Sequence, residues 1–202
     1  MAAVSRWSAA AHAKPSERSA RIRLLKDREH YEDVILGVLS QARVSVWIST
    51  ANLKEVMIEA PLGSAARARG RYLSITERLV ELVRRGVEVR ILHASSPSRP
   101  LRQALRQCPE LAQPAFELRQ CPRVHMKVIA VDGSYLYLGS ANLTGAGLGA
   151  KGDGRRNFEL GIGTDDDWML DVVQARYQRI WSGGECAGCR LQAECGAPLS
   201  AD

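Results

Sequence analysis

The chain has 202 residues, which is enough for one well-buried domain and too few for two domains of ordinary size. Hydrophobic residues make up 46% and charged residues 25%, as in soluble globular proteins, and no apolar run approaches the ~20 residues of a membrane-spanning helix. The net charge of +6 favours an anionic partner such as nucleic acid or a membrane surface, whereas an aromatic content of 5% argues against a large base-stacking platform.

The first part of the chain is predicted to be a tail followed by a helix and a strand. Residues 1–23 are polar and lack the apolar core of a signal peptide, which predicts a cytoplasmic protein. Apolar residues at helical spacing predict a helix over Leu24–Gln41. The β-branched run Arg43–Ser49 then predicts a strand that is mostly buried.

A basic loop and an amphipathic helix are expected next. The segment Thr50–Tyr72 contains Pro and Gly together with three arginines, Arg67, Arg69 and Arg71. These arginines either contact a phosphate backbone or are solvated charges on a surface loop. Ser74–Arg85 is predicted to be a helix, because Ser74 and Glu77 have the spacing of a capping box and the apolar residues lie on one stripe.

The elements predicted between Val87 and Arg119 continue an alternation of strands and helices. Val87–Leu92 is predicted to be a strand, and the strand, helix, strand order implies parallel pairing through a right-handed crossover. A short helix over Leu101–Gln107 and a strand over Phe116–Arg119 follow. The sequence therefore predicts an α/β sandwich, in which a mixed sheet is flanked by helices on both faces.

A β-hairpin with reactive side chains is predicted next. In a strand, residues two apart share a face, so His125 and Lys127 are expected to point the same way. Asp132 and the glycine after it form a tight-turn signal, and Tyr135–Leu138 has the pattern of the returning strand. The small residues that follow allow close backbone approach. Two residues there add short hydrogen-bonding side chains, Ser140 and Asn142.

Written as spacing, the hairpin reads H-x-K-x4-D-x6-G-S-x-N, which resembles the complete signature of the phospholipase D superfamily. The positions are His125, Lys127, Asp132, Gly139, Ser140 and Asn142. The alternative interpretation, a core hairpin with a solvated histidine and lysine, does not account for six residue types at fixed offsets. The resemblance covers residues 24–182 and implies a phospholipase D-like sandwich with phosphodiester chemistry. Superfamily enzymes carry two such motifs per active site, and this chain has one.

The segment after the motif is rich in glycine and carries three basic residues, Lys151, Arg155 and Arg156. Two interpretations stay open, a phosphate clamp or lid beside the motif and a disordered surface loop. Asn157–Thr164 is predicted to be a strand, and Glu159 matches the acidic residue that hydrogen-bonds the catalytic histidine in the resembled family. Asp165–Asp167 is expected to cap a long amphipathic helix that ends at Trp181.

The resemblance assigns chemical roles to these residues. A neutral His125 imidazole would attack phosphorus, and Glu159 would fix its tautomer and stabilise the cation that forms. Lys127 and Asn142 would hold the nonbridging oxygens. Ser140 would either do the same or order the hairpin. The mechanism needs no divalent cation, because histidine and lysine supply what a metal would otherwise provide.

The departing alcohol oxygen also needs an acid. Asp132 lies at the turn and is assigned an orienting or structural role, so the acid is expected to be a second histidine. The other histidines of the chain lack the accompanying lysine, and they are His12, His30 and His93. A two-fold homodimer would solve the problem, because an isologous interface brings His125 of each subunit into one cleft.

The C-terminal tail, residues 183–202, contains a cysteine motif with the spacing C-x2-C-x5-C. Its members are Cys186, Cys189 and Cys195. A reducing cytoplasm disfavours disulfides, so these thiolates and a distant fourth, Cys121 or Cys108, suit a structural zinc ion or a [4Fe–4S] cluster, with free thiols as the alternative. The spacing also resembles that of iron–sulfur nucleases, in which a remote fourth cysteine completes the cluster.

The expected function is that of a homodimeric, metal-independent nuclease acting on DNA or RNA. The single motif looks most like that of the small bacterial endonucleases of the superfamily, and the flanking loops are basic. One alternative is a phospholipase or phosphatidyl transferase, which would need an exposed apolar rim near His125 that the sequence does not show. The other is a non-catalytic nucleic-acid-binding subunit of a larger complex. A helicase or translocase partner is compatible with so small a nuclease.

Overall fold

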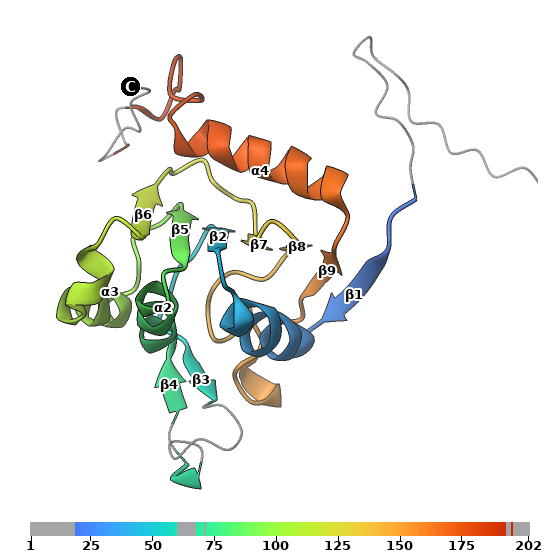
Figure 1. Cartoon of the computed structure of the whole chain (residues 1–202), viewed down its shortest axis with the longest axis vertical. Coiled ribbons are helices and arrows are strands. Elements are labelled where there is room, and N and C mark those ends of the chain that lie inside the picture. The colour runs from blue at the N-terminus through green and yellow to red at the C-terminus, as the bar shows by residue number, and fades with distance from the viewer. Residues whose placement is uncertain (1–18, 60–67, 71, 193–194, 196–202) are drawn as a thin grey trace, which may run out of the picture.

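A seven-stranded mixed sheet forms the centre of the computed structural model, which describes residues 19–59, 68–70, 72–192 and 195 (Figure 1). In spatial order its strands are β1 (Ile22–Lys26), β9 (Leu160–Thr164), β8 (Tyr135–Gly139), β7 (Val128–Val131), β2 (Ser45–Thr50), β5 (Glu88–His93) and β6 (Phe116–Gln120). A separate pair is formed by β3 (Met57–Glu59) and β4 (Tyr72–Ser74). The predicted α/β sandwich is confirmed.

Helical elements cover both faces of the large sheet (Figure 1). They are η1 (His30–Val38), η2 (Leu39–Gln41), α2 (Ile75–Arg84), α3 (Arg99–Gln107), η3 (Pro109–Ala112), η4 (Asp153–Arg155) and α4 (Asp167–Trp181). α4 lies across one face, and η1, α2 and α3 lie on the other. No helix within the described part of the chain is both long and apolar enough to cross a membrane.

The strand pairing divides the sheet into a parallel half and an antiparallel half. β2, β5 and β6 are parallel neighbours, and α2 forms the crossover between β2 and β5, as the strand, helix, strand order predicts. β7, β8, β9 and β1 pair antiparallel. β7 also pairs antiparallel with β2, so the start of β7 lies beside the end of β2. This junction brings the motif to the edge of the sheet where the parallel strands end.

The predicted helix over Leu24–Gln41 is wrong at its beginning. Ile22–Lys26 is a strand that pairs with β9, and the helical segment begins only at His30. Leu25 is buried while Leu24 is exposed, which is strand alternation. Asp27 then adopts a positive φ of 47° and turns the chain. The pairing partner lies far along the sequence, so local spacing could not reveal this strand.

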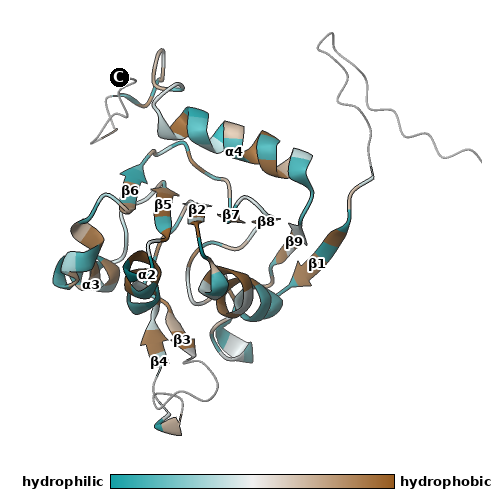
Figure 2. Ribbon diagram, viewed as in Figure 1, coloured by the Kyte–Doolittle hydropathy of each residue, from teal (hydrophilic) through white to brown (hydrophobic). Residues whose placement is uncertain are grey.

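The helix beginnings follow from capping residues. The Ser74 hydroxyl accepts a hydrogen bond from the Glu77 backbone N–H at 3.1 Å, and the Glu77 carboxylate accepts one from the Ser74 N–H at 2.6 Å. The predicted capping box of α2 is therefore confirmed. At α4, the Asp166 carboxylate accepts from the Met169 N–H at 2.9 Å. Figure 2 shows hydrophobic residues in strand β5, which lies between the two helix layers.

The motif glycine at position 139 is explained by a tyrosine ring. Gly139 lies opposite Gly161 in the β8–β9 pair, and the Tyr137 side chain crosses both. A Cβ atom at position 139 would lie 2.2 Å from the Tyr137 hydroxyl oxygen and 3.0 Å from the Gly161 Cα. Tyr137 is itself 1% exposed. Glycine at this position therefore lets a large buried side chain pack directly on the backbone.

We expect Gly139→Ala to lower the free energy of unfolding by about 1–3 kcal/mol, because the added methyl group overpacks the buried Tyr137 ring. Urea unfolding followed by circular dichroism measures this change. Gly154→Ala is the matched control, since a Cβ atom there meets no atom within 4 Å. Equal stability of the two variants would contradict the packing explanation.

Candidate active site

His125 and Lys127 lie together just before strand β7. The Lys127 Nζ atom is 3.0 Å from each ring nitrogen of His125 and donates to the His125 carbonyl oxygen at 2.8 Å. Both residues precede the strand, which begins at Val128, so the predicted strand placement is wrong although the predicted proximity is right. His125 is exposed and Lys127 is only 8% exposed. An accessible imidazole therefore lies against a buried ammonium group.

The burial of Lys127 affects its pKa. Removal from water lowers the pKa of the Lys127 ammonium below the ordinary lysine value, and the negative charge of Glu159 opposes this shift. Glu159 is therefore close enough to interact electrostatically with the cation.

Glu159 is held by polar neighbours from the segments after β8 and before β9. One carboxylate oxygen accepts a hydrogen bond from the Ser140 hydroxyl, and the other accepts from the Asn157 amide at 2.9 Å. The Glu159 backbone N–H donates to the Asp27 carboxylate at 3.1 Å. Within the described part of the chain, no hydrogen bond joins Glu159 to His125. Its direct partners are Ser140 and Asn157, and Asp27 is a supporting residue that the sequence pattern did not reveal.

Asn142 connects the end of the motif to the end of β2. Its side-chain oxygen accepts hydrogen bonds from the backbone N–H groups of Ala51 and Asn52 at 3.1 and 3.0 Å. The Thr50 hydroxyl lies 3.3 Å from the same oxygen. These donors fix the orientation of the amide, because only its oxygen can accept. Among the described residues no acceptor pairs with the Asn142 amide nitrogen, which leaves its N–H groups for a ligand oxygen.

Asp132 lies outside the site. It begins the turn at the far end of β7 with a φ of 54°, and a four-residue strand spans about 13 Å. Its carboxylate accepts hydrogen bonds from the backbone N–H groups of Arg43, Val44 and Ser45, the last two at 2.8 and 2.9 Å. Burial acts to raise the pKa of Asp132, but these three donors lower it overall. Asp132 is a structural anchor between the hairpin and the start of β2.

The loop after the motif is folded onto the core. Leu143 and Leu148 are buried, and Gly149, with a φ of 73°, packs against the backbone of Arg28. The disordered-loop interpretation is therefore wrong. The three basic residues of this loop lie on its surface. Arg156 pairs with Asp153 at 2.9 Å, and Lys151 and Arg155 are exposed.

The arginines of the earlier loop are less informative. Arg67 and Arg71 lie outside the described residues. Arg69 is exposed between β3 and β4, and Figure 1 shows that pair projecting from the side of the sheet opposite α4. His125, in contrast, lines a pocket with side chains of α4. The structure does not bring Arg69 together with His125.

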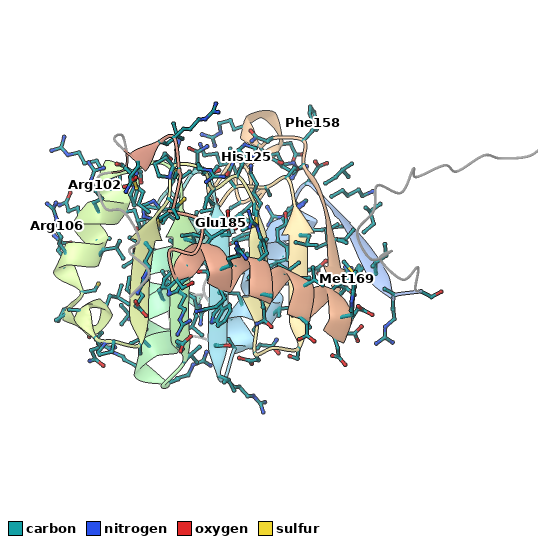
Figure 3. The ribbon with its side chains drawn as sticks, turned by 90° about the horizontal axis from the view of Figure 1, so that it is seen from above. Arg102, Arg106, His125, Phe158, Met169 and Glu185 are labelled. Carbon is teal, nitrogen blue, oxygen red and sulfur yellow. The ribbon has the colours of Figure 1, made fainter. Side chains whose placement is uncertain are left out.

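An apolar surface borders the pocket that contains His125. The pocket is lined by Met126, Lys127, Val128, Leu138 and Gly139 on one side and by Val172, Val173 and Arg176 of α4 on the other. Three segments, β1, the start of β9 and α4, carry further exposed apolar side chains, of which Val172 also lines the pocket. We call this set the apolar edge: Ile22, Leu24, Phe158, Leu160, Trp168 and Val172. Phe158 is 95% exposed, and Figure 3 shows it on the same edge of the molecule as His125. The expectation that no apolar rim lies near His125 is therefore wrong.

The five cysteines lie in two separate pockets. Four of them line one cavity next to the C-terminal tail that follows α4: Cys121, Cys186, Cys189 and Cys195. Cys108 lines a different pocket, next to η3. Within the described residues, no group of three or more His, Cys, Asp or Glu is close enough to count as a formed metal centre.

Comparison with known proteins identifies the family. The model of the family described as cardiolipin synthase, PLD-like domain, matches residues 35–181. The chain therefore belongs to the phospholipase D-like family, which supports a phosphodiesterase activity. No curated protein sequence matches the chain.

Solved structures share the fold at low sequence identity. Nuc, a phospholipase D family member from Salmonella typhimurium, is 18% identical with a TM-score of 0.56, over 81% of this chain and 95% of that one. TrmBL2, an archaeal chromatin protein described as binding DNA, is 13% identical with a TM-score of 0.50, over 83% and 55% of the two chains. Phosphatidylserine synthase from Haemophilus influenzae Rd KW20 is 16% identical with a TM-score of 0.51, over 78% and 37%.

We expect the pKa of Lys127 to lie below that of an ordinary lysine, and Glu159→Gln to lower it further by removing the opposing negative charge. Because the ammonium is disfavoured in the folded state, the unfolded chain binds more protons in this pH range, so stability rises as the pH approaches the ordinary lysine value. Titration of the Lys127 side chain by NMR measures the shift. Asp153→Asn, which removes an exposed carboxylate paired with Arg156, should leave it unchanged. A pKa that rises in Glu159→Gln would contradict the assignment.

Proposed function

We propose that this chain is a metal-independent nuclease that cleaves DNA or RNA through a phosphohistidine intermediate, in an active site shared by two subunits. The observation that carries the proposal is the exposed His125 imidazole resting on the buried Lys127 ammonium, with the Asn142 amide fixed to the end of β2. These groups supply a nucleophile, a positive charge and hydrogen-bond donors on one edge of the sheet.

The first step forms a bond between a His125 ring nitrogen and phosphorus while the bond from phosphorus to the departing alcohol oxygen breaks. Lys127 and the Asn142 amide stabilise the charge that grows on the nonbridging oxygens. A protonated histidine of the second subunit donates its proton to the departing oxygen. In the second step that histidine, now neutral, takes a proton from water. The water oxygen bonds to phosphorus, and the bond to His125 breaks.

The described part of one chain supplies a single histidine for these two roles. His30 is fully buried and His93 is 4% exposed, and the ring nitrogen Nδ1 of each contacts a backbone carbonyl oxygen. Burial lowers the pKa of His93, which makes it a poor source of protons. His12 lies outside the described residues. A second copy of the chain is the simplest source of the missing acid.

The apolar edge is the surface that we assign to this second copy. It adjoins the His125 pocket through Val172, and it lies where α4 leaves the outer strands β1 and β9 uncovered. Contiguous exposed apolar side chains are typical of subunit interfaces. Pairing two copies through this edge would bury Phe158 and Leu24, and it would place the two His125 pockets near the two-fold axis.

Charge favours nucleic acid as the substrate. The net charge is +6, and exposed Lys151 and Arg155 lie on the loop that follows the motif. Phosphate contacts of this kind supply most of the affinity of nucleases for nucleic acid. A cytoplasmic location is part of this proposal, because the substrate is found there.

A second candidate is a phosphodiesterase or phosphatidyl transferase that acts on lipid. The observation in its favour is the apolar edge beside His125, since exposed aromatic and aliphatic side chains also bind membrane surfaces. The same fold occurs in a chromatin protein described as binding DNA and in a phosphatidylserine synthase, so the fold alone does not choose between the substrates.

We expect the wild-type chain to cut labelled single-stranded or double-stranded DNA or RNA in excess EDTA, and His125→Ala to reduce the rate by about 10³-fold or more, because both nucleophile and acid are lost. His12→Ala is the control for loss of a histidine, because the proposal assigns that residue no role. Circular dichroism checks that each variant is folded in EDTA. Turnover of phospholipid vesicles without nucleic-acid cleavage would favour the lipid enzyme instead. Nucleic-acid binding that is unchanged in His125→Ala, with no turnover of either substrate, would indicate a non-catalytic subunit.

We expect Leu24→Glu and Phe158→Asp to shift a dimer toward monomer in analytical ultracentrifugation and to lower activity in parallel, because each places a charge in the interface. Val44→Glu is the matched control. Val44 is 65% exposed, like Leu24 at 64%, and it lies just before the start of β2, at the end of that strand away from the motif. After subunit exchange in an equal mixture of wild type and His125→Ala, the rate should be about one quarter of that of wild type at the same total chain concentration, rather than about one half, if every site needs both histidines. If both variants remain dimeric, the apolar edge is not the dimer interface.

A further inference from the structure

The cysteine-containing tail is a feature that the nuclease reaction does not use. After α4 the backbone forms successive turns in which an N–H group bonds to the carbonyl oxygen three residues earlier. The bonds join Cys186 to Gly183, Cys189 to Cys186, Gln192 to Cys189 and Cys195 to Gln192, at 2.9 to 3.3 Å. All three cysteines of the tail line one cavity.

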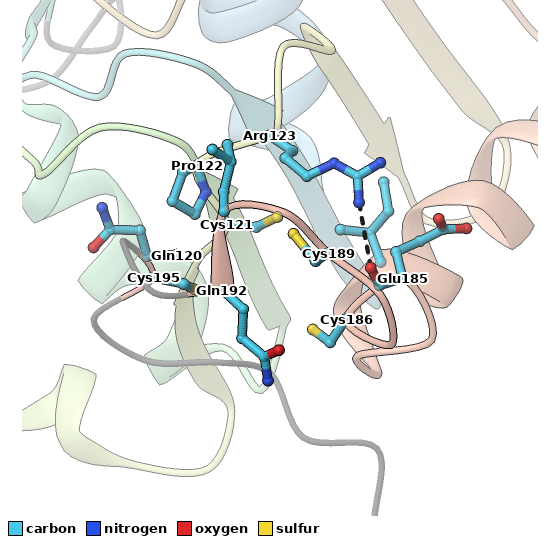
Figure 4. A pocket seen from close by; sticks show the side chains of 11 residues that line it. Gln120, Cys121, Pro122, Arg123, Glu185, Cys186, Cys189, Gln192 and Cys195 are labelled. Atoms are coloured by element: carbon cyan, nitrogen blue, oxygen red, sulfur yellow. Dashed lines mark hydrogen bonds between the residues drawn. The ribbon is translucent and has the colours of Figure 1, made fainter.

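That cavity is also lined by the segment between β6 and β7. Cys121 is fixed there by a hydrogen bond from its N–H to the His93 carbonyl oxygen at 2.8 Å and by one from the Val124 N–H to its own carbonyl oxygen at 3.0 Å. Figure 4 shows the sulfur atoms of Cys121 and Cys189 facing each other across the cavity. The fourth thiol that the sequence could not choose is therefore supplied by the strand-to-motif segment.

The tail has little else to hold it on the domain. Its described residues after Trp181 add no large apolar side chain to the buried core. Its polar contacts are made chiefly by Glu185, whose carboxylate pairs with Arg176 and Arg179 at 2.6 and 2.7 Å and whose carbonyl oxygen accepts from Arg123 at 3.3 Å. Exposed ion pairs of this kind contribute little stability. A segment without a core is usually fixed by a cross-link or a metal.

We propose that Cys121, Cys186, Cys189 and Cys195 bind one structural zinc ion. Four thiolates are a common zinc ligand set, with tetrahedral geometry and Zn–S distances of about 2.3 Å. The four thiols line one cavity, as ligands of a single shared ion must. Binding would draw the thiols from their present spacing to ligand distance.

Cys108 does not belong to this site. It lies in a pocket whose charged lining residues include Glu77, Glu81 and Glu110. Burial raises the pKa of the Cys108 thiol, and the charge of Glu110 raises it further, so the metal-binding thiolate form is disfavoured. Cys108 and Cys121 are both followed by proline, which makes them a matched pair for a test.

The proposed role is structural, because four protein thiolates leave no open position for a water or substrate. The ion would join the tail to a residue four positions before His125. It would therefore hold the end of α4 and the approach to the active site together.

The test is the metal content of the full chain purified without chelators, measured by inductively coupled plasma mass spectrometry. We expect about one zinc per chain in the wild type and in Cys108→Ser, and a loss of most zinc in Cys121→Ser and Cys189→Ser. His125→Ala should keep its zinc, so the result is independent of nuclease activity. Zinc retained by Cys121→Ser, or no zinc in the wild type, would overturn the proposal. Iron with acid-labile sulfide would also overturn it.

A second measurement covers the case in which a cysteine variant does not fold. Cobalt(II) substituted into the wild-type chain should give the thiolate charge-transfer and d–d absorption bands of a tetrahedral four-sulfur site. Bands of an octahedral ion would contradict the assignment. An intact mass showing a disulfide between Cys121 and a tail cysteine, without metal, would also contradict it.

Discussion

The burial of one ammonium group explains most of the geometry around the motif. Lys127 is almost entirely removed from water, and an isolated charge in that position would cost several kcal/mol. The His125 carbonyl oxygen and the charge of Glu159 compensate it. Glu159 is buried in turn, so its carboxylate needs the Ser140 hydroxyl and the Asn157 amide. Each residue in this chain of contacts satisfies the polar group before it, which is how a buried polar network remains stable.

The same reasoning separates the motif into two functions. Asp132 belongs to the spacing pattern, yet its carboxylate accepts three backbone N–H groups at the start of β2, far from His125. Gly139 belongs to it because Tyr137 packs on its backbone. Both residues fix the register of the hairpin, whereas His125, Lys127 and Asn142 present polar groups at its open end. The sequence signature therefore contains residues that stabilise the hairpin as well as residues proposed to take part in the reaction.

Sequence patterns predicted what depends on neighbouring residues and missed what depends on distant ones. The capping box at Ser74 and the β7–β8 turn are local, and both were predicted correctly. Strand β1 was predicted as a helix because its partner β9 is far along the chain. The apolar edge was missed for a similar reason, since its side chains come from three segments that contain no continuous apolar run. The choice between Cys108 and Cys121 likewise required the tertiary fold.

The position of His125 depends on what holds the segment before β7. His125 is not within a strand, so no ladder hydrogen bonds fix its backbone. On one side Lys127 anchors it. On the other side Val124 is buried against Tyr177 and Trp181 at the end of α4. Catalysis needs a nucleophile held to within a fraction of an ångström. If zinc joins Cys121 to the tail that follows α4, the ion also restrains the segment between β6 and β7. The tail would then help to hold His125 in position.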